Sequence, residues 1–201
     1  MKNNRMTFVA AMIPAGVALN WVANYVVEAL KIPLFLNNMG SIITAIVLGP
    51  IWGMVTGLLT NTILALTVRW TYFPFTVVGW VILLLAYMFF RMGWFRKVYL
   101  VIIGGAIDGV IASAASAVVA TYVFGGFTGN TIDIFTAGLM AAGQKVFSAS
   151  FLANLGPTVV DKAIQFWLVW IILKYFPNKY LPNAKEIKSL LTARSLEIGE
   201  E

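Results

Sequence analysis

Long apolar runs, separated by short polar stretches, divide the chain into six predicted helices. The polar stretches contain Pro, Gly, Asn or charged residues, which end helices and favour turns. The apolar runs are continuous, whereas a transmembrane β-barrel would show segments of alternating polar and apolar residues. The pattern predicts helices over residues 8–29, 39–48, 51–68, 75–90, 98–124 and 157–176. The expected fold class is therefore all-α, a polytopic membrane protein with a bundle of six transmembrane helices.

The segment 131–156 differs from these runs because it is only weakly amphipathic and contains Asp133, Gln144 and Lys145. We expect it to form an interfacial or re-entrant piece before the last helix. The predicted membrane domain is then 1–176, and residues 177–201 form a cytoplasmic tail.

The composition indicates a membrane protein and excludes several kinds of reactive or metal-binding side chain. Hydrophobic residues make up 60% of the 201 positions and charged residues only 11%, which excludes a soluble globular domain and a disordered chain. With no Cys and no His, the chain has no thiolate nucleophile, and it lacks the commonest general base and metal ligand. We therefore expect no catalytic residue, no metal site and no cofactor.

Positive charges predict the orientation, because Lys and Arg are enriched in cytoplasmic segments. With six crossings and a cytoplasmic N-terminus, ten of the 14 basic residues lie inside: Lys2, Arg5, Arg91, Arg96, Lys97, Lys174, Lys179, Lys185, Lys188 and Arg194. Four lie outside or near the outside: Lys31, Arg69, Lys145 and Lys162. Both termini are expected in the cytoplasm, in a cytoplasmic (inner) membrane. The basic residues lie at membrane edges, so no nucleic-acid partner is expected.

Small residues four positions apart let transmembrane helices approach closely. Such pairs occur at Gly53 with Gly57 and at Gly105 with Gly109, where we expect packing inside the bundle. The pair Ala11 and Ala15 opens the first helix. Two interpretations stand for that pair, packing within the bundle and packing against a partner subunit.

Several of these features occur together in one known family. Six helices in about 200 residues, the early Ala11 and Ala15, and the sequence LGPIWGMVTG at 48–57 leading to Asn61 resemble the substrate-binding S components of energy-coupling factor (ECF) vitamin transporters. The likeness in topology covers nearly the whole chain, and the likeness in sequence is concentrated in residues 33–61.

This resemblance implies a six-helix bundle that captures a water-soluble vitamin in a pocket near the extracellular helix ends. Family members associate with a transmembrane coupling protein and two cytoplasmic ATPases, and are thought to topple in the bilayer. Ala11 and Ala15 match the small-residue surface that meets the coupling protein, although Pro14 between them is expected to kink the helix. The chain contains no phosphate-binding Gly-x-x-x-x-Gly-Lys-Ser/Thr loop, so ATP hydrolysis is assigned to the partners.

Ionisable residues within membrane spans are candidates for function. Asp108 is expected roughly 15 Å into its helix, where it either contacts the ligand or makes a structural bond to Lys145, Lys162, Ser113 or Thr60. Asp161 and Gln165 share a helix face and are expected to point inward, with Lys162 reaching the outer interface. The alternative is that Asp161 and Lys162 both anchor the helix at the interface.

Amides and aromatic residues complete the candidate site. Asn20 and Asn24 share one helix face, and Asn37 and Asn38 lie in the loop that follows that helix. Asn61 lies within the predicted helix 51–68, and Asn154 lies just before Gly156 and Pro157. These amides suit the carbonyls and ring nitrogens of a vitamin, or act as caps and turn formers. Trp70, Tyr72 and Phe73 are expected either to form a lid that stacks on a flat ring or to anchor the chain at the interface.

The leading functional hypothesis is a non-enzymatic membrane subunit that captures a ring-containing vitamin, such as cobalamin, riboflavin or a pyridoxine-type compound. The first alternative is a membrane sensor that docks a signalling partner, and the second is a small membrane enzyme. The sequence does not distinguish between the vitamins, because it gives no pocket volume.

Overall fold

The computed structural model describes residues 2–181 and 183–192, with side chains from Met6 onward except that of Tyr180. This part of the chain is helical and contains no β-strand. Its α-helices are α1 (Lys2–Ala29), α2 (Met39–Leu48), α3 (Pro50–Thr67), α4 (Thr76–Arg91), α5 (Val98–Phe124), α6 (Asp133–Ala141), α7 (Val146–Tyr175) and α8 (Ala184–Leu191). Three short 3-10 helices, η1 (Trp70–Tyr72), η2 (Trp94–Arg96) and η3 (Asn178–Tyr180), lie in the connections.

Four of these helices, α1, α3, α5 and α7, are long and apolar enough to cross a membrane. The apolar helices α2 and α4 are shorter, with 10 and 16 residues. The prediction of an all-helical, membrane-embedded protein is confirmed at this level. The count of six crossings stays a prediction.

The last long helix differs from the prediction, which placed its start at Pro157. Helix α7 begins at Val146 and continues for 30 residues through Pro157. Proline removes one backbone hydrogen bond, but transmembrane helices tolerate this when neighbouring helices support them. The predicted segment 131–156 is therefore divided between α6, a turn at Gly143 with a φ of 91°, and the start of α7. Asp161 and Lys162 consequently lie in the middle of the helix.

Glycines allow α5 and α7 to pack closely, backbone against backbone. A Cβ atom on Gly105 would lie 2.7 Å from Ala163 Cα, and one on Gly109 would lie 2.5 Å from Val159 Cα. The prediction that this pair packs inside the bundle is confirmed.

The first three helices are also joined through small and polar residues. A Cβ atom on Gly53 would lie 2.5 Å from the Ala45 Cβ. Gly16 and Gly40, which the sequence did not single out, bring the backbones of α1 and α2 together. Asn20 accepts a hydrogen bond from the Gly40 N–H at 2.7 Å and donates to Ser41 Oγ at 2.9 Å.

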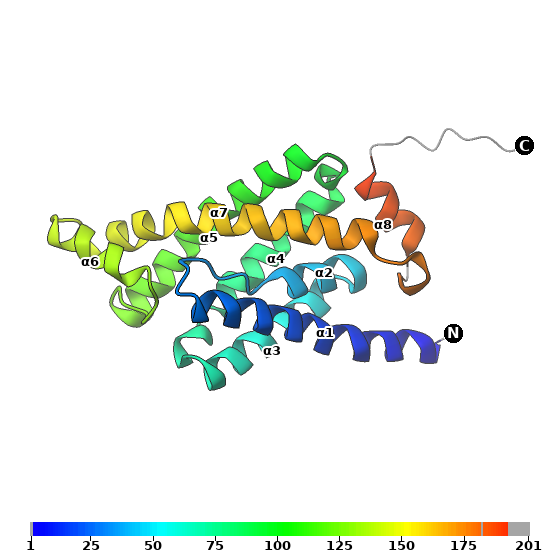
Figure 1. Cartoon of the computed structure of the whole chain (residues 1–201), viewed down its shortest axis with the longest axis horizontal. Coiled ribbons are helices and arrows are strands. Elements are labelled where there is room, and N and C mark those ends of the chain that lie inside the picture. The colour runs from blue at the N-terminus through cyan, green and yellow to red at the C-terminus, as the bar shows by residue number, and fades with distance from the viewer. Residues whose placement is uncertain (1, 182, 193–201) are drawn as a thin grey trace, which may run out of the picture.

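The helix ends gather at two opposite ends of the molecule (Figure 1). The start of α1 and the short helix α8 lie at one end, and α6 lies at the other. Helix α8 folds back on the bundle through the buried Ile187 and Leu191. The Lys188 ammonium donates to the carbonyls of Leu173, Lys174 and Phe176 at 2.7–2.9 Å, and so caps the end of α7. The predicted tail is described as far as Thr192, so Arg194 lies outside the described residues.

Candidate ligand-binding cavity

A cavity with about 70 Å³ of space open to the centre of a water-sized sphere lies beside α6, which contributes Asp133 and Thr136 to its lining. Helices α4, α5 and α7 supply its walls at positions three or four residues apart, which place side chains on one helix face. The residues concerned are Val78, Gly79 and Ile82 on α4 together with Phe75 directly before it, Ala112, Ser116 and Ala120 on α5, and Asn154, Thr158 and Lys162 on α7. Asn61 on α3, Asp133 and Thr136 on α6, and the segments before α2, after α3 and after α5 complete the lining.

Two side chains of α7 hold the segment before α2 in place. The Asp161 Oδ1 atom accepts hydrogen bonds from the backbone N–H groups of Phe35 and Leu36, both at 3.0 Å. Gln165 Oε1 accepts the N–H of Asn38 at 3.2 Å. Leu36 has a φ of 46°, a left-handed conformation that is unfavourable for leucine unless its surroundings fix it. Asp161 and Gln165 therefore hold in place a segment that lines the cavity, although neither of these two side chains lines the cavity.

The other oxygen of Asp161 binds Lys162. The Lys162 Nζ atom donates to Asp161 Oδ2 at 2.5 Å, and Gln165 Nε2 donates to the same oxygen at 2.8 Å. The prediction that Lys162 reaches the outer interface is wrong, since its side chain is only 2% exposed and faces the cavity. Two causes explain this: α7 starts earlier than predicted, and the flexible lysine stem bends back to the neighbouring carboxylate.

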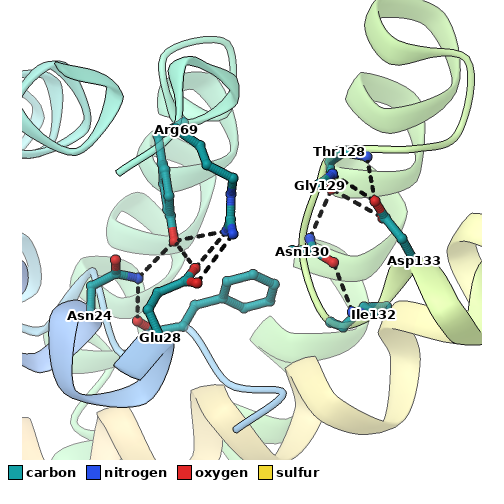
Figure 2. A network of polar contacts seen from close by, with 10 residues as sticks. Asn24, Glu28, Arg69, Thr128, Gly129, Asn130, Ile132 and Asp133 are labelled. Atoms are coloured by element: carbon teal, nitrogen blue, oxygen red, sulfur yellow. Dashed lines mark hydrogen bonds and ion pairs between the residues drawn. The ribbon is translucent and has the colours of Figure 1, made fainter. Parts of the chain in front are cut away.

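A polar network joins α1 to η1 at the cavity (Figure 2). The guanidinium of Arg69 binds both oxygens of Glu28, at 2.5 and 3.1 Å. The Tyr72 hydroxyl donates to Glu28 Oε1 at 2.6 Å, and Asn24 Nδ2 donates to Tyr72 Oη and to the Phe35 carbonyl, both at 3.0 Å. Burial and the Glu28 carboxylate raise the pKa of Tyr72 above its usual range. The phenol therefore stays neutral at physiological pH.

A second network orders the loop between α5 and α6 (Figure 2). Asp133 accepts the N–H groups of Thr128 and Gly129 at 2.8 and 2.6 Å, and Asn130 Oδ1 accepts that of Ile132 at 2.8 Å. Gly129 has a φ of 80°, and a Cβ atom on it would lie 3.4 Å from Arg69 Cδ. The loop therefore passes close to the first network.

Of the three predicted lid residues, only Tyr72 lines the cavity. Trp70 and Phe73 are 68% and 53% exposed, and the structure does not bring them to the cavity. Trp70 packs edge-on against Phe124 on the outside of α5. Phe75 lines the cavity instead, with its ring stacked on Phe124 at 5.9 Å between centroids.

The remaining predicted site residues fall into two groups. Asn38, Asn61 and Asn154 line the cavity, and Asn24 contacts lining residues without lining it. Asp108 is fully buried on α5, one turn before Ala112, and its carboxylate makes no hydrogen bond or ion pair with the described residues.

The partners expected for Asp108 are engaged elsewhere. The Ser113 and Thr60 hydroxyls donate to carbonyls in their own helices, those of Gly109 and Thr56, and the Lys145 side chain is exposed. Lys162 and Asp161 are near enough to act on Asp108 electrostatically. None of its expected partners forms a hydrogen bond with Asp108, and Asp108 does not line the cavity; its contact with a ligand stays a prediction.

Sequence reasoning missed several lining residues, among them Phe35, Thr136, Thr158 and Lys162. The spacing of four between Asn154, Thr158 and Lys162 could have found two of them, had α7 been predicted as one helix. An apolar residue such as Phe35 in a loop gives no comparable signal.

The face of α1 that carries Ala11 and Ala15 is exposed. These residues therefore do not pack inside the described part of the bundle. No group of three or more metal-binding acidic side chains occurs among the described residues. Comparisons with protein-family models, with curated proteins and with solved structures found no match to this chain.

Proposed function

We propose that this protein is the substrate-capture membrane subunit of an ATP-driven importer of the ECF type, and that it binds a ring-containing, water-soluble vitamin. The observation that carries the proposal is the cavity at one end of the helical bundle, lined by amides, hydroxyls and the rings of Phe35, Tyr72 and Phe75. Small-molecule sites typically combine apolar and aromatic walls with a few oriented polar groups.

Sites for drug-sized ligands have volumes of roughly 300 to 1,000 Å³. The space in this cavity that is open to the centre of a water-sized sphere is about 70 Å³, so binding of a vitamin requires the lining to move apart.

The proposed topology has six crossings, made by α1 to α5 and α7, with both termini in the cytoplasm. Helix α2 has ten residues and rises about 15 Å, about half of the hydrocarbon core. The segment before it completes that crossing, because its backbone N–H groups bind Asp161 and Gln165 inside the protein. In this orientation the cavity opens to the outside of the cytoplasmic membrane.

Energy supply is assigned to other chains, a transmembrane coupling protein and two cytoplasmic ATPases. The exposed small-residue face at Ala11 and Ala15 is the proposed contact with the coupling protein. Small residues at such a face allow two helices to approach closely within the membrane.

Mass spectrometry of small molecules released from the purified, folded protein tests this function. We expect a ring-containing vitamin to co-purify, and to rebind to the emptied protein without nucleotide. A strict requirement for ATP in rebinding, or hydrolysis of a substrate by the isolated chain, would contradict the proposal.

A further inference from the structure

Three residues from different parts of the chain meet at one corner of the cavity. Asn38 precedes α2, Asn61 lies on α3 and Gly79 lies on the first turn of α4, and all three line the cavity. We refer to Asn38, Asn61 and Gly79 as the amide corner.

The amide corner holds polar atoms without a protein partner. Asn61 is only 5% exposed, yet its amide makes no hydrogen bond with any described residue. Asn38 donates from Nδ2 to Asn37 Oδ1 at 2.8 Å, while its own Oδ1 accepts no hydrogen bond from the described residues. Both residues line the cavity, so these atoms are open to a ligand.

Gly79 leaves the space in which such a ligand would lie. A Cβ atom at this position would be 3.0 Å from Asn38 Oδ1 and 3.9 Å from Asn61 Nδ2. Even one methyl group would therefore crowd the amide of Asn38 and fill part of the corner.

The charged side chains that face the cavity are already engaged. Arg69 binds Glu28, Lys162 binds Asp161, and Asp133 accepts backbone N–H groups. A charged ligand would have to break one of these pairs, whereas an uncharged ligand leaves them intact.

We propose that the amide corner determines ligand specificity by binding an uncharged carboxamide, lactam or imide edge of a planar ring. Such an edge carries both a donor and an acceptor, which complement the free atoms of Asn61 and Asn38. The rings of Phe35, Tyr72 and Phe75 line the same cavity and offer apolar walls to the planar ring. This inference rests on the proposed function and specifies its class of substrate.

Binding of four probes to the full-length protein tests the inference. Riboflavin carries an imide edge and nicotinamide a carboxamide, while nicotinate has the same ring as nicotinamide with a carboxylate, and pyridoxine has no amide. We expect riboflavin or nicotinamide to bind at least about tenfold more tightly than nicotinate and pyridoxine, the loss expected for one hydrogen bond to a buried group.

The variant Gly79→Ala tests the amide corner separately from folding, because alanine stabilises a helix more than glycine does. We expect it to weaken binding of the preferred probe about tenfold or more while the melting temperature of the empty protein is kept or raised. Gly156→Ala, on α7 with no atom within 4 Å of its added Cβ, is the matched control and should bind as the wild type does. Asn61→Ala gives a second test of the corner if Gly79→Ala does not fold.

Tightest binding of nicotinate or pyridoxine would overturn the inference but leave the proposed function in place. Equal affinities of the Gly79→Ala and Gly156→Ala variants would also overturn it. A folded protein that binds none of the four probes overturns the inference, while the proposed function is tested separately by the identity of the co-purified small molecule.

Discussion

At the scale of single residues, Asp161 links several parts of the molecule through one carboxylate. Its two carboxylate oxygens accept hydrogen bonds from the Phe35 and Leu36 backbones, from Lys162 and from Gln165. A buried ion pair of this kind contributes little net stability when intact, but removing one partner leaves the other charge buried without compensation.

Replacing Asp161 by Ala is therefore expected to destabilise the protein by about 3 to 5 kcal/mol, measured by thermal unfolding in detergent. The double variant Asp161→Asn with Lys162→Met removes both charges and should recover part of this loss. Asp108→Asn is the comparison, because the Asp108 carboxylate has no described hydrogen-bond partner and its replacement by an amide should leave stability unchanged or raise it. A larger loss for Asp108→Asn than for Asp161→Ala would contradict this ranking.

Tyr72 gives a prediction of pH dependence. Burial raises its pKa above the ordinary value of 10.0, so above pH 10 the unfolded chain releases a proton that the folded protein retains. The corresponding stability is fully present below pH 10 and is lost as pH rises further. Between pH 10 and 11 the melting temperature of the wild type should fall more steeply than that of Tyr72→Phe, and parallel curves would refute this assignment.

At the scale of elements, the close approach of α5 and α7 is the contact most sensitive to size. A Cβ atom on Gly109 would lie 2.5 to 3.0 Å from three backbone atoms of α7. Backbone atoms cannot move aside as a flexible side chain can. These two neighbouring helices, which both line the cavity, thus pack through glycines of α5 that have no side chain.

Gly109→Ala is expected to lower stability by about 1 to 3 kcal/mol, although alanine is normally the better helix former. Gly138→Ala on α6, where the added Cβ meets no atom within 4 Å, is the control and should be neutral or stabilising. Thermal unfolding of both variants measures the difference. Equal melting temperatures of the Gly109→Ala and Gly138→Ala variants would mean that α5 and α7 can move apart without a loss of stability.

Sequence pattern predicted those elements whose ends are marked by strong local signals. The bounds of α2 and α5 are as predicted, because a Gly-Pro pair ends the first and charged residues and glycines flank the second. Helix α7 was predicted too short, since the local signal of Gly156 and Pro157 is outweighed by packing against α5.

The same difference explains which parts of the candidate site were foreseen. Asn38, Asn61 and Asn154 stand out as amides within or beside apolar runs, and they line the cavity. Thr158 and Lys162 share a helix face with Asn154 only if the helix is continuous through Pro157. The contribution of Gly79 can be recognised only when the positions of the two neighbouring amides are known.

At the scale of the whole molecule, the two ends of the bundle have different properties. The end toward α6 carries the candidate cavity, and the opposite end carries α8 and the start of α1. Ala11 and Ala15 lie in the N-terminal half of α1, which starts at that second end, and their face is exposed. Ligand binding and partner binding are thus expected at separate places.

Ala11→Trp or Ala15→Trp should therefore abolish uptake in cells while binding of the ligand to the isolated protein is retained, because a large indole blocks close helix approach. Uptake assays and binding measurements on the same variants test this separation. If ligand binding were lost as well, these alanines would belong to the packing of the bundle itself.

The shared carboxylate of Asp161 has a kinetic consequence. The segment that carries Phe35 cannot lift away from α7 without also weakening the environment of the Lys162 ammonium, since both depend on one side chain. We expect ligand entry and exit to proceed by one concerted opening, with a single exponential phase in stopped-flow fluorescence. The rate of that phase, more than the affinity, should change when Asp161 is replaced by Asn.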